Sequence, residues 1–193
     1  MRAPRDTLVH LTPDGDLVPG ATPGAVRLWP FTQSRRFLWR SRNPRWLDPI
    51  NLLALRTAPA AVVEMLARQG WQRPDDGATH RTWIDGAFVT MTDHTALGDR
   101  SERVHIRLFA FGDATLVAAH HEVAKNGGHH HVTSWDRARQ VTADALDAAG
   151  ATRIAPTGVL TPPDLRGAAS DGRVWRLVAD EAPDTPAGER PTG

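Results

Sequence analysis

The sequence predicts an α+β fold of the ferredoxin-like, split βαβ kind, a sandwich in which a mainly antiparallel sheet has its helices on one face. Three observations support this prediction: an apolar run before a segment of helical spacing, two alternating segments joined by a two-residue turn, and a second helical segment after them. The predicted order is strand, helix, strand, strand, helix, strand. The other face of the sheet is expected to be free for ligands.

The first strand and helix are expected between residues 50 and 70. The run Ile50 to Leu55 is apolar throughout, as in a buried strand. Pro59 suits a first helical turn, and apolar residues then follow at helical spacing until Gly70, a common C-terminal stop. Residues 77–100 have a mixed pattern that predicts only a short strand from Phe88 to Met91.

The middle of the chain predicts a β-hairpin. Residues 104–111 alternate with period two, Gly112-Asp113 is a pair typical of tight turns, and strand-like sequence resumes from Thr115 to Val123. A two-residue turn places His105 directly opposite His120, with Glu122 on the same face. A turn one residue longer would instead set His121 against His105 and move Glu122 to the opposite face.

The second helix and the two ends complete the plan. Ser134 suits an N-cap and Asp136 a first turn, which predicts a helix to Gly150. Later strands are expected around Val159-Leu160 and Val174 to Val178, and the turn sequence Pro13-Asp14-Gly15-Asp16 predicts an N-terminal hairpin extension. We expect one domain over residues 1–182, with its core at about 46–180, and a mobile, disordered tail over 183–193.

Composition limits the classes of protein to consider. The 193 residues include no cysteine, which excludes disulfides, thiolate zinc sites and iron–sulfur clusters. The formal net charge of +1 gives no global field toward nucleic acid or membrane. No apolar run approaches the length of a membrane span, and the first residues lack the apolar centre of a signal peptide, so a cytoplasmic location is expected.

Histidine is concentrated in one stretch. Five of the nine histidines lie between His120 and His131. Two histidines and a carboxylate are the ligand set of open zinc or iron sites, so His105, His120 and Glu122 are metal candidates. The candidates for a ligand or metal site are His105, His120, His121, Glu122 and His131, because one of the loop histidines 129–131 is expected to complete the site. Alternatively, these histidines are hydrogen-bonded strand residues and a solvated loop that binds no metal.

Arginines mark candidate anion sites. A helix beginning after Ser134 directs backbone N–H groups outward, which favours an anion near Arg139, and Arg107 lies in the histidine strand. The segment 35–46 combines arginines with tryptophan and phenylalanine, a composition that suits phosphates, bases and membrane interfaces. The alternative for this segment is a packed aromatic core covered by arginine stems. The anion-binding candidates are Arg107, Arg139, Arg35, Arg36 and Arg40.

Several of these segments together resemble the LssY C-terminal domain family, a poorly characterised bacterial module. The residues that carry the resemblance are Asp48-Pro49-Ile50-Asn51-Leu52, Gly70-Trp71, His105-Ile106-Arg107-Leu108, and His131 with Asp136 and Arg139. They cover roughly residues 46–150. The resemblance implies a shared domain, and it implies no established reaction. The chain departs from the family pattern in its Ala119-His120-His121-Glu122 segment and its three-histidine loop, which are richer in histidine.

Three functions are compatible with these features. The first is an uncharacterised bacterial ligand-binding α+β domain with a histidine-rich site on the sheet, whose partner is a small molecule or a metal. The second is a metal-dependent hydrolase or oxygenase that uses His105, His120 and Glu122 with a divalent cofactor such as zinc or iron. The third is a binder of nucleic acid or anionic membranes through residues 35–46. The usual phosphate-loop, dinucleotide, HExxH and GxSxG motifs do not occur.

Overall fold

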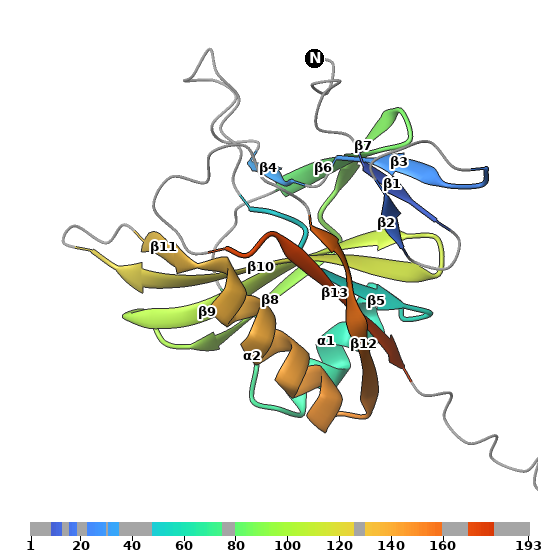
Figure 1. The fold of residues 1–193 in the computed structure, drawn as a ribbon. Coiled ribbons are helices and arrows are strands. Elements are labelled where there is room, and N and C mark those ends of the chain that lie inside the picture. The colour runs from blue at the N-terminus through green and yellow to red at the C-terminus, as the bar shows by residue number, and fades with distance from the viewer. Residues whose placement is uncertain are drawn as a thin grey trace, which may run out of the picture.

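Two β-sheets and two helices make up the described part of the structure, a computed structural model (Figure 1). It describes residues 9–12, 16–18, 23–29, 31–34, 48–74, 80–125, 130–159 and 170–179. The α+β class is therefore confirmed. Residues 35–47, with Arg35, Arg36 and Arg40, and the predicted tail over 183–193 lie outside the described residues.

The larger sheet has seven strands in the order β12-β13-β5-β10-β9-β8, with β11 paired to β10. Every pairing is antiparallel except that of β13 with β5, which is parallel. Its strands are β5 (Leu52–Leu55), β8 (Asp93–Gly98), β9 (Glu102–Phe111), β10 (Ala114–Ala124), β11 (His130–Ser134), β12 (Ala151–Val159) and β13 (Arg173–Ala179).

The smaller, antiparallel sheet has six short strands in the order β2-β1-β3-β6-β4, with β7 paired to β6. They are β1 (Val9–Leu11), β2 (Leu17–Val18), β3 (Val26–Leu28), β4 (Gln33–Ser34), β6 (His80–Ile84) and β7 (Ala87–Thr90). The predicted N-terminal hairpin is confirmed as β1 and β2, but it is part of this sheet rather than a separate extension. Figure 1 shows the smaller sheet above the larger one.

Both helices pack on one face of the larger sheet, as predicted. Helix α1 (Pro59–Ala67) starts with proline, and α2 (Trp135–Ala148) starts at the N-cap Ser134, whose side chain accepts a hydrogen bond from the Arg137 amide. Leu66 and Leu146 from the helices meet Ile106 and Val117 from the sheet in one apolar core. None of the helices in the described ranges is long and apolar enough to cross a membrane.

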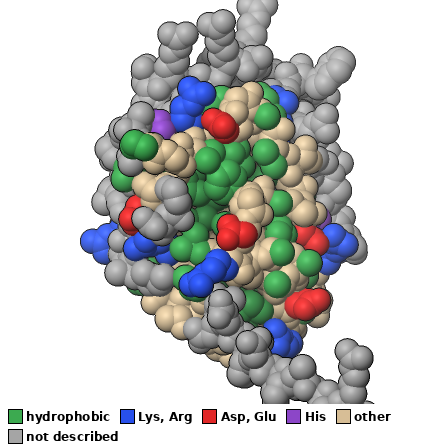
Figure 2. Space-filling view, turned by 90° about the vertical axis from the view of Figure 1, so that its right-hand side faces the viewer, with side chains coloured by type: hydrophobic (Ala, Val, Ile, Leu, Met, Phe, Trp, Pro, Cys, Tyr) green, Lys and Arg blue, Asp and Glu red, His purple; other side chains and the backbone are tan. Residues whose placement is uncertain are grey.

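The opposite face of the larger sheet is not free, contrary to the sequence expectation. Phe109 and Leu116 on this face pack with Leu11, Leu28 and Ile84 of the smaller sheet in a second apolar core. The short strands of residues 9–34 and 80–90, whose pattern was too weak to predict a sheet, provide this cover. Figure 2 shows apolar side chains gathered in the middle of one face of the molecule, with histidine visible only near its margins.

The ferredoxin-like plan agrees with the structure in only part of the sheet. Strands β5, β10 and β9 lie side by side and antiparallel, with α1 and α2 in the predicted places along the chain. In that plan the strand after the second helix pairs antiparallel with the first strand. Here β12, the strand after α2, lies at the sheet edge and returns as β13, which pairs with β5 in parallel because the return reverses the chain direction.

Candidate functional site

The candidate site lies on the larger sheet, at the end of the β9–β10 hairpin that is far from its turn. Strands β8, β9, β10 and β11 lie side by side there, at the left of Figure 1. Side chains of a strand alternate between its faces, so Leu116, Ala118, His120 and Glu122 of β10 share the face opposite the helices. Along this face the side chains change from apolar to charged.

The hairpin register predicted from Gly112-Asp113 is confirmed. Phe111 pairs with Ala114, and His120 therefore lies directly opposite His105. Their ring centroids are 5.2 Å apart. The next pair on the same face is Arg103 with Glu122. Both cross-strand pairs, His105 with His120 and Arg103 with Glu122, follow from the two-residue turn.

Three side chains meet at one point of this face. One nitrogen of His105, one nitrogen of His120 and one carboxylate oxygen of Glu122 all lie within 4.8 Å of one another. Zinc bonds to imidazole nitrogen and to carboxylate oxygen are about 2.0 to 2.2 Å long, so atoms at this separation can share one ion. All three side chains are buried.

Asp48 binds the far side of His120. Its Oδ2 atom lies 3.3 Å from His120 Nδ1 and accepts a hydrogen bond from Arg107, and its Oδ1 atom accepts one from the Trp135 indole N–H at 3.3 Å. Residues 48 and 107 are 59 positions apart in the chain. The sequence indicated Asp48 only as a turn residue and as part of the family resemblance, so this central carboxylate was not among the predicted site residues.

Glu122 is held from three directions. Its Oε2 atom lies 3.0 Å from His120 Nε2, while Oε1 accepts a hydrogen bond from Arg103 Nε and lies 3.5 Å from His130 Nδ1. His120 thus has a carboxylate oxygen beside each ring nitrogen. Arg103 holds Oε1, and Oε2 is left directed at His120.

Asn51 connects this site to the rest of the sheet. Its side-chain amide donates to the Ala119 carbonyl and accepts from the Ala119 amide, both at 2.9 Å, so it pairs with β10 as a strand backbone would. The same amide group also donates to the carbonyl of Trp135 at 3.3 Å. Asn51 therefore joins the segment after Asp48, the strand of His120 and the first residue of α2.

Burial and neighbouring charges set the protonation of the two opposed histidines. Burial, together with the positive charge of Arg107, holds the pKa of His105 well below its usual value, so His105 is neutral. Burial also lowers the pKa of His120, but the carboxylates of Asp48 and Glu122 more than offset this, and the net pKa is raised. The Arg107 guanidinium, whose Nη1 lies 3.0 Å from His120 Nδ1, opposes the protonated ring, while the two carboxylates favour it.

The two carboxylates shift in the opposite direction. Burial raises the pKa of Asp48, yet His120 and Arg107 more than reverse this and the net pKa is well below its usual value. For Glu122 the same balance, with His120 and Arg103 as the cations, lowers the pKa to about 2. Both carboxylates are ionised at neutral pH, and each lies between His120 and one arginine.

Two of the predicted site residues lie elsewhere. His121 points to the helix face, where Nδ1 contacts Thr133 Oγ1 and Nε2 lies 2.8 Å from Glu102 Oε1. His131 is exposed and pairs with Val123, also on the helix side of β10. The loop histidine near the site is His130 instead, because a bulge between His121 and Glu122 shifts the register of β11.

Two of the predicted anion-binding arginines, Arg107 and Arg139, lie in the described ranges, and both are engaged by carboxylates of the protein. Arg107 pairs with Asp48. Arg139 is buried and donates to both oxygens of Asp171, at 2.7 and 3.0 Å, and to the Arg173 carbonyl at 2.6 Å. Arg139 therefore connects α2 to the start of β13 rather than offering an open anion site.

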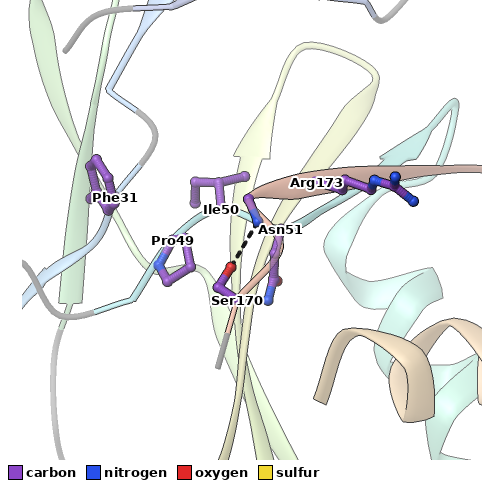
Figure 3. Close-up of a pocket in the computed structure, with 7 residues that line it drawn as sticks. Phe31, Pro49, Ile50, Asn51, Ser170 and Arg173 are labelled. Atoms are coloured by element: carbon purple, nitrogen blue, oxygen red, sulfur yellow. Dashed lines mark hydrogen bonds between the residues drawn. The ribbon is translucent and has the colours of Figure 1, made fainter. Parts of the chain in front are cut away.

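Two hollows lie near these elements. The first is bordered by Phe31, Pro49, Ile50, Asn51, Ser170, Gly172 and Arg173, and within it the Gly172 amide donates to Ser170 Oγ at 3.1 Å (Figure 3). Its volume of about 10 Å³ is at the limit for one water molecule. The second is an open cleft of about 590 Å³, large enough for a small molecule, whose lining includes Arg103 and His130.

Comparisons with family models, curated proteins and solved structures gave no match for this chain. The resemblance to the LssY C-terminal domain family stays a prediction.

Proposed function

We propose that this protein binds a divalent transition-metal ion through His105, His120 and Glu122. The observation that carries this proposal is the convergence of three ligand atoms within 4.8 Å from two neighbouring strands. A neutral imidazole is the form that coordinates a metal, and the lowered pKa of His105 keeps it in that form. His120 would offer the metal Nε2, the ring nitrogen that faces Glu122, in its deprotonated form.

The surroundings of these ligands support the proposal. Metal-binding histidines usually donate their other ring N–H to a carboxylate, which orients the ring and raises its basicity. Asp48 stands in this position beside Nδ1 of His120. Arg103 likewise holds the oxygen of Glu122 that is turned away from His120, so both ligands are oriented by a partner from outside the metal centre.

Three protein ligands leave one position of a tetrahedral site for water or substrate, the arrangement of catalytic rather than structural zinc sites. We infer a metal-dependent hydrolase or oxygenase, in which the metal supplies Lewis-acid or redox chemistry. His130 lies at the outer side of Glu122 with part of its side chain exposed. It also lines the open cleft, so it lies between the cleft and the proposed metal ligand.

A metal-free ligand-binding domain is the second candidate. The observation that favours it is the raised pKa of His120, whose two ring nitrogens are each satisfied by a carboxylate without any metal. In that case the cluster is a buried ion network that fixes the sheet, and a small molecule binds in the neighbouring cleft.

Metal analysis of the untagged full-length chain separates the two candidates. The protein is loaded with Zn²⁺ or Co²⁺, dialysed and measured by elemental analysis. Metal binding predicts about one ion per chain, lost in His105→Ala and in His120→Ala, and retained in the matched controls His121→Ala and His131→Ala. No retained metal in the folded wild-type chain contradicts the metal proposal.

The finer predictions remain proposals as well. The antiparallel set β5-β10-β9 with α1 and α2 supports a relationship to ferredoxin-like folds, while the parallel β13–β5 pairing departs from it. The anionic-surface binding predicted from residues 35–46 is tested by salt-dependent binding to DNA or to phosphatidylserine vesicles. A cytoplasmic location and a single domain over 1–182 are likewise predictions.

A further inference from the structure

We propose that the open cleft beside Glu122 binds the anionic group of a small-molecule substrate, a phosphate or a carboxylate, through Arg100 with the help of Arg73 and Arg103. This inference rests on the proposed metal site, because it names the class of substrate that would reach that site. The cleft is lined by Gln72, Arg73, Pro74, Ala96, Gly98, Asp99, Arg100, Arg103, Ala124 and His130.

The cleft and the metal site share a wall. Arg103 and His130 line the cleft, and each of them also contacts Oε1 of Glu122. Strand pairing places Gly98 beside Arg103, and Arg103 beside Glu122. A molecule bound in the cleft is therefore one side chain away from the proposed metal ligand.

The turn that carries Arg100 is held in place. Oδ1 of Asp99 accepts hydrogen bonds from the Ser101 amide and hydroxyl, both at 2.6 Å, and from the Glu102 amide at 3.2 Å. The Ser101 carbonyl in turn accepts from the Ala124 amide of β10 at 2.8 Å. The position of Arg100 over the cleft is thus fixed by both neighbouring strands.

Gly98 allows this turn to close tightly. Its φ angle is +113°, and a Cβ atom there would lie 2.4 Å from the Glu102 carbonyl oxygen. A side chain at this position would push the turn away from β9. The close approach of the two strands sets the edge of the cleft.

The charge of the cleft favours an anion. Its lining has three arginines and one aspartate, and Asp99 is occupied by the hydrogen bonds of its own turn. Arg73 pairs with Asp93, and Arg103 pairs with Glu122. Arg100 has neither an ion pair nor a hydrogen bond with any residue in the described ranges, so its guanidinium contributes the unmatched positive charge.

Guanidinium groups bind phosphate and carboxylate in the same bidentate manner. Phosphorylated and carboxylated substrates would therefore be recognised by the same arginines. The cleft volume of about 590 Å³ suits a small molecule rather than a protein segment. Phosphate and acetate titrations distinguish a phosphorylated substrate from a carboxylated one.

The test measures anion binding to the full-length chain in two states, metal-free and loaded with Co²⁺. Inorganic phosphate and acetate are titrated separately by calorimetry at low chloride, and the visible spectrum of the cobalt form is followed. We expect phosphate or acetate to bind one per chain, and the cobalt spectrum to change as the anion binds. Arg100→Gln is expected to weaken binding at least tenfold and Arg73→Gln less. The control Arg68→Gln, which changes an exposed arginine at the C-cap of α1 that does not line the cleft, should leave binding within twofold.

Each outcome decides a separate point. Tighter binding of phosphate than acetate identifies a phosphorylated substrate class, and the reverse order identifies a carboxylate. Absence of anion binding, or equal binding by Arg100→Gln and wild type, overturns the cleft proposal while cobalt binding leaves the metal proposal standing. If the chain binds no cobalt, the metal proposal fails, and Arg100-dependent phosphate binding by the metal-free chain would then support the cleft alone.

Discussion

The two ends of the β9–β10 hairpin present different chemistry on the same face of the sheet. Near the turn, Phe109 and Leu116 are buried against the smaller sheet in an apolar core. At the far end, His120 and Glu122 are buried to nearly the same degree, with 2% and 6% of their surface exposed. At the turn end, another apolar side chain of similar volume can keep the packing intact. At the far end, a buried charge is stabilised only while its oppositely charged partners are present.

The largest loss of stability at the far end is expected when a buried carboxylate is removed. Asp48→Ala leaves Arg107 and His120 without their shared partner, and we expect the free energy of unfolding to fall by about 3 to 5 kcal/mol. Phe109→Ala at the turn end should cost a similar amount, about 3 to 5 kcal/mol, through the cavity that it leaves. Urea denaturation measures both.

The control for this pair is Asp144→Ala, which removes an exposed partner of Arg153 and should cost less than about 1 kcal/mol. Asp48→Asn, which keeps the shape of the side chain, gives a folded variant if Asp48→Ala does not fold. If Asp48→Ala lowered the free energy of unfolding no more than Asp144→Ala does, the charges at the far end would be solvated rather than held in a buried ion network.

Zinc is expected to stabilise the far end selectively. At a free zinc concentration of about 100 times the dissociation constant, a ligand that binds only the folded state adds about 2.7 kcal/mol to the free energy of unfolding. This gain should appear in wild type, in Phe109→Leu and in His121→Ala, and should vanish in His120→Ala and Glu122→Gln. An equal gain in His120→Ala would place the zinc elsewhere.

Acid should weaken the far end before it affects the turn end. The pKa of Glu122 is lowered to about 2 in the folded chain, so its stabilising contribution is complete above its usual value of 4.5 and is lost as pH falls toward 2. After allowance for partial solvent screening, this contribution is roughly 2 kcal/mol.

The measurement for this prediction is urea denaturation of the metal-free chain between pH 6 and pH 2.5. Glu122→Gln should show a shallower decline than wild type over that interval, and Phe109→Leu should follow the wild-type slope. Parallel curves for Glu122→Gln and wild type would mean that Glu122 is not held as an ionised partner of His120.

The smallest effect is expected for His121, the sequence neighbour of His120. It faces the helices, and its partner Glu102 keeps half of its side chain exposed. We expect His121→Ala to lower the free energy of unfolding by about 1 kcal/mol, because water replaces part of the lost bonding. A loss as large as that of Asp48→Ala would remove the distinction between the two faces of β10.

Local patterns predicted the elements that depend on neighbouring residues. The tight turn at Gly112-Asp113 determined which residues of β9 and β10 face each other, and the N-cap at Ser134 marked the start of α2. The smaller sheet could not be predicted in the same way, because its strands have two to five residues each, too few for a periodic pattern.

The site was predicted in part for the same reason. His105, His120 and Glu122 follow from one hairpin register, but Asp48 comes from a segment 59 residues before Arg107, and no local pattern indicates that contact. Of the loop histidines 129–131, the sequence favoured His131, whereas the structure places His130 beside Glu122, because the register of β11 shifts between His121 and Glu122. Single-residue bulges of this kind leave no mark in an alternating sequence.

The contacts of Asn51 determine at what stage of folding the site is assembled. Because its side chain closes contacts with Ala119 and Trp135, which lie 68 and 84 residues later, the cluster is complete only after the chain from β5 to α2 has come together. The isolated hairpin has all three proposed ligands but neither Asp48 nor this connection. A metal ion would therefore select the assembled chain over its fragments and would favour late steps of folding, when the long-range contacts form.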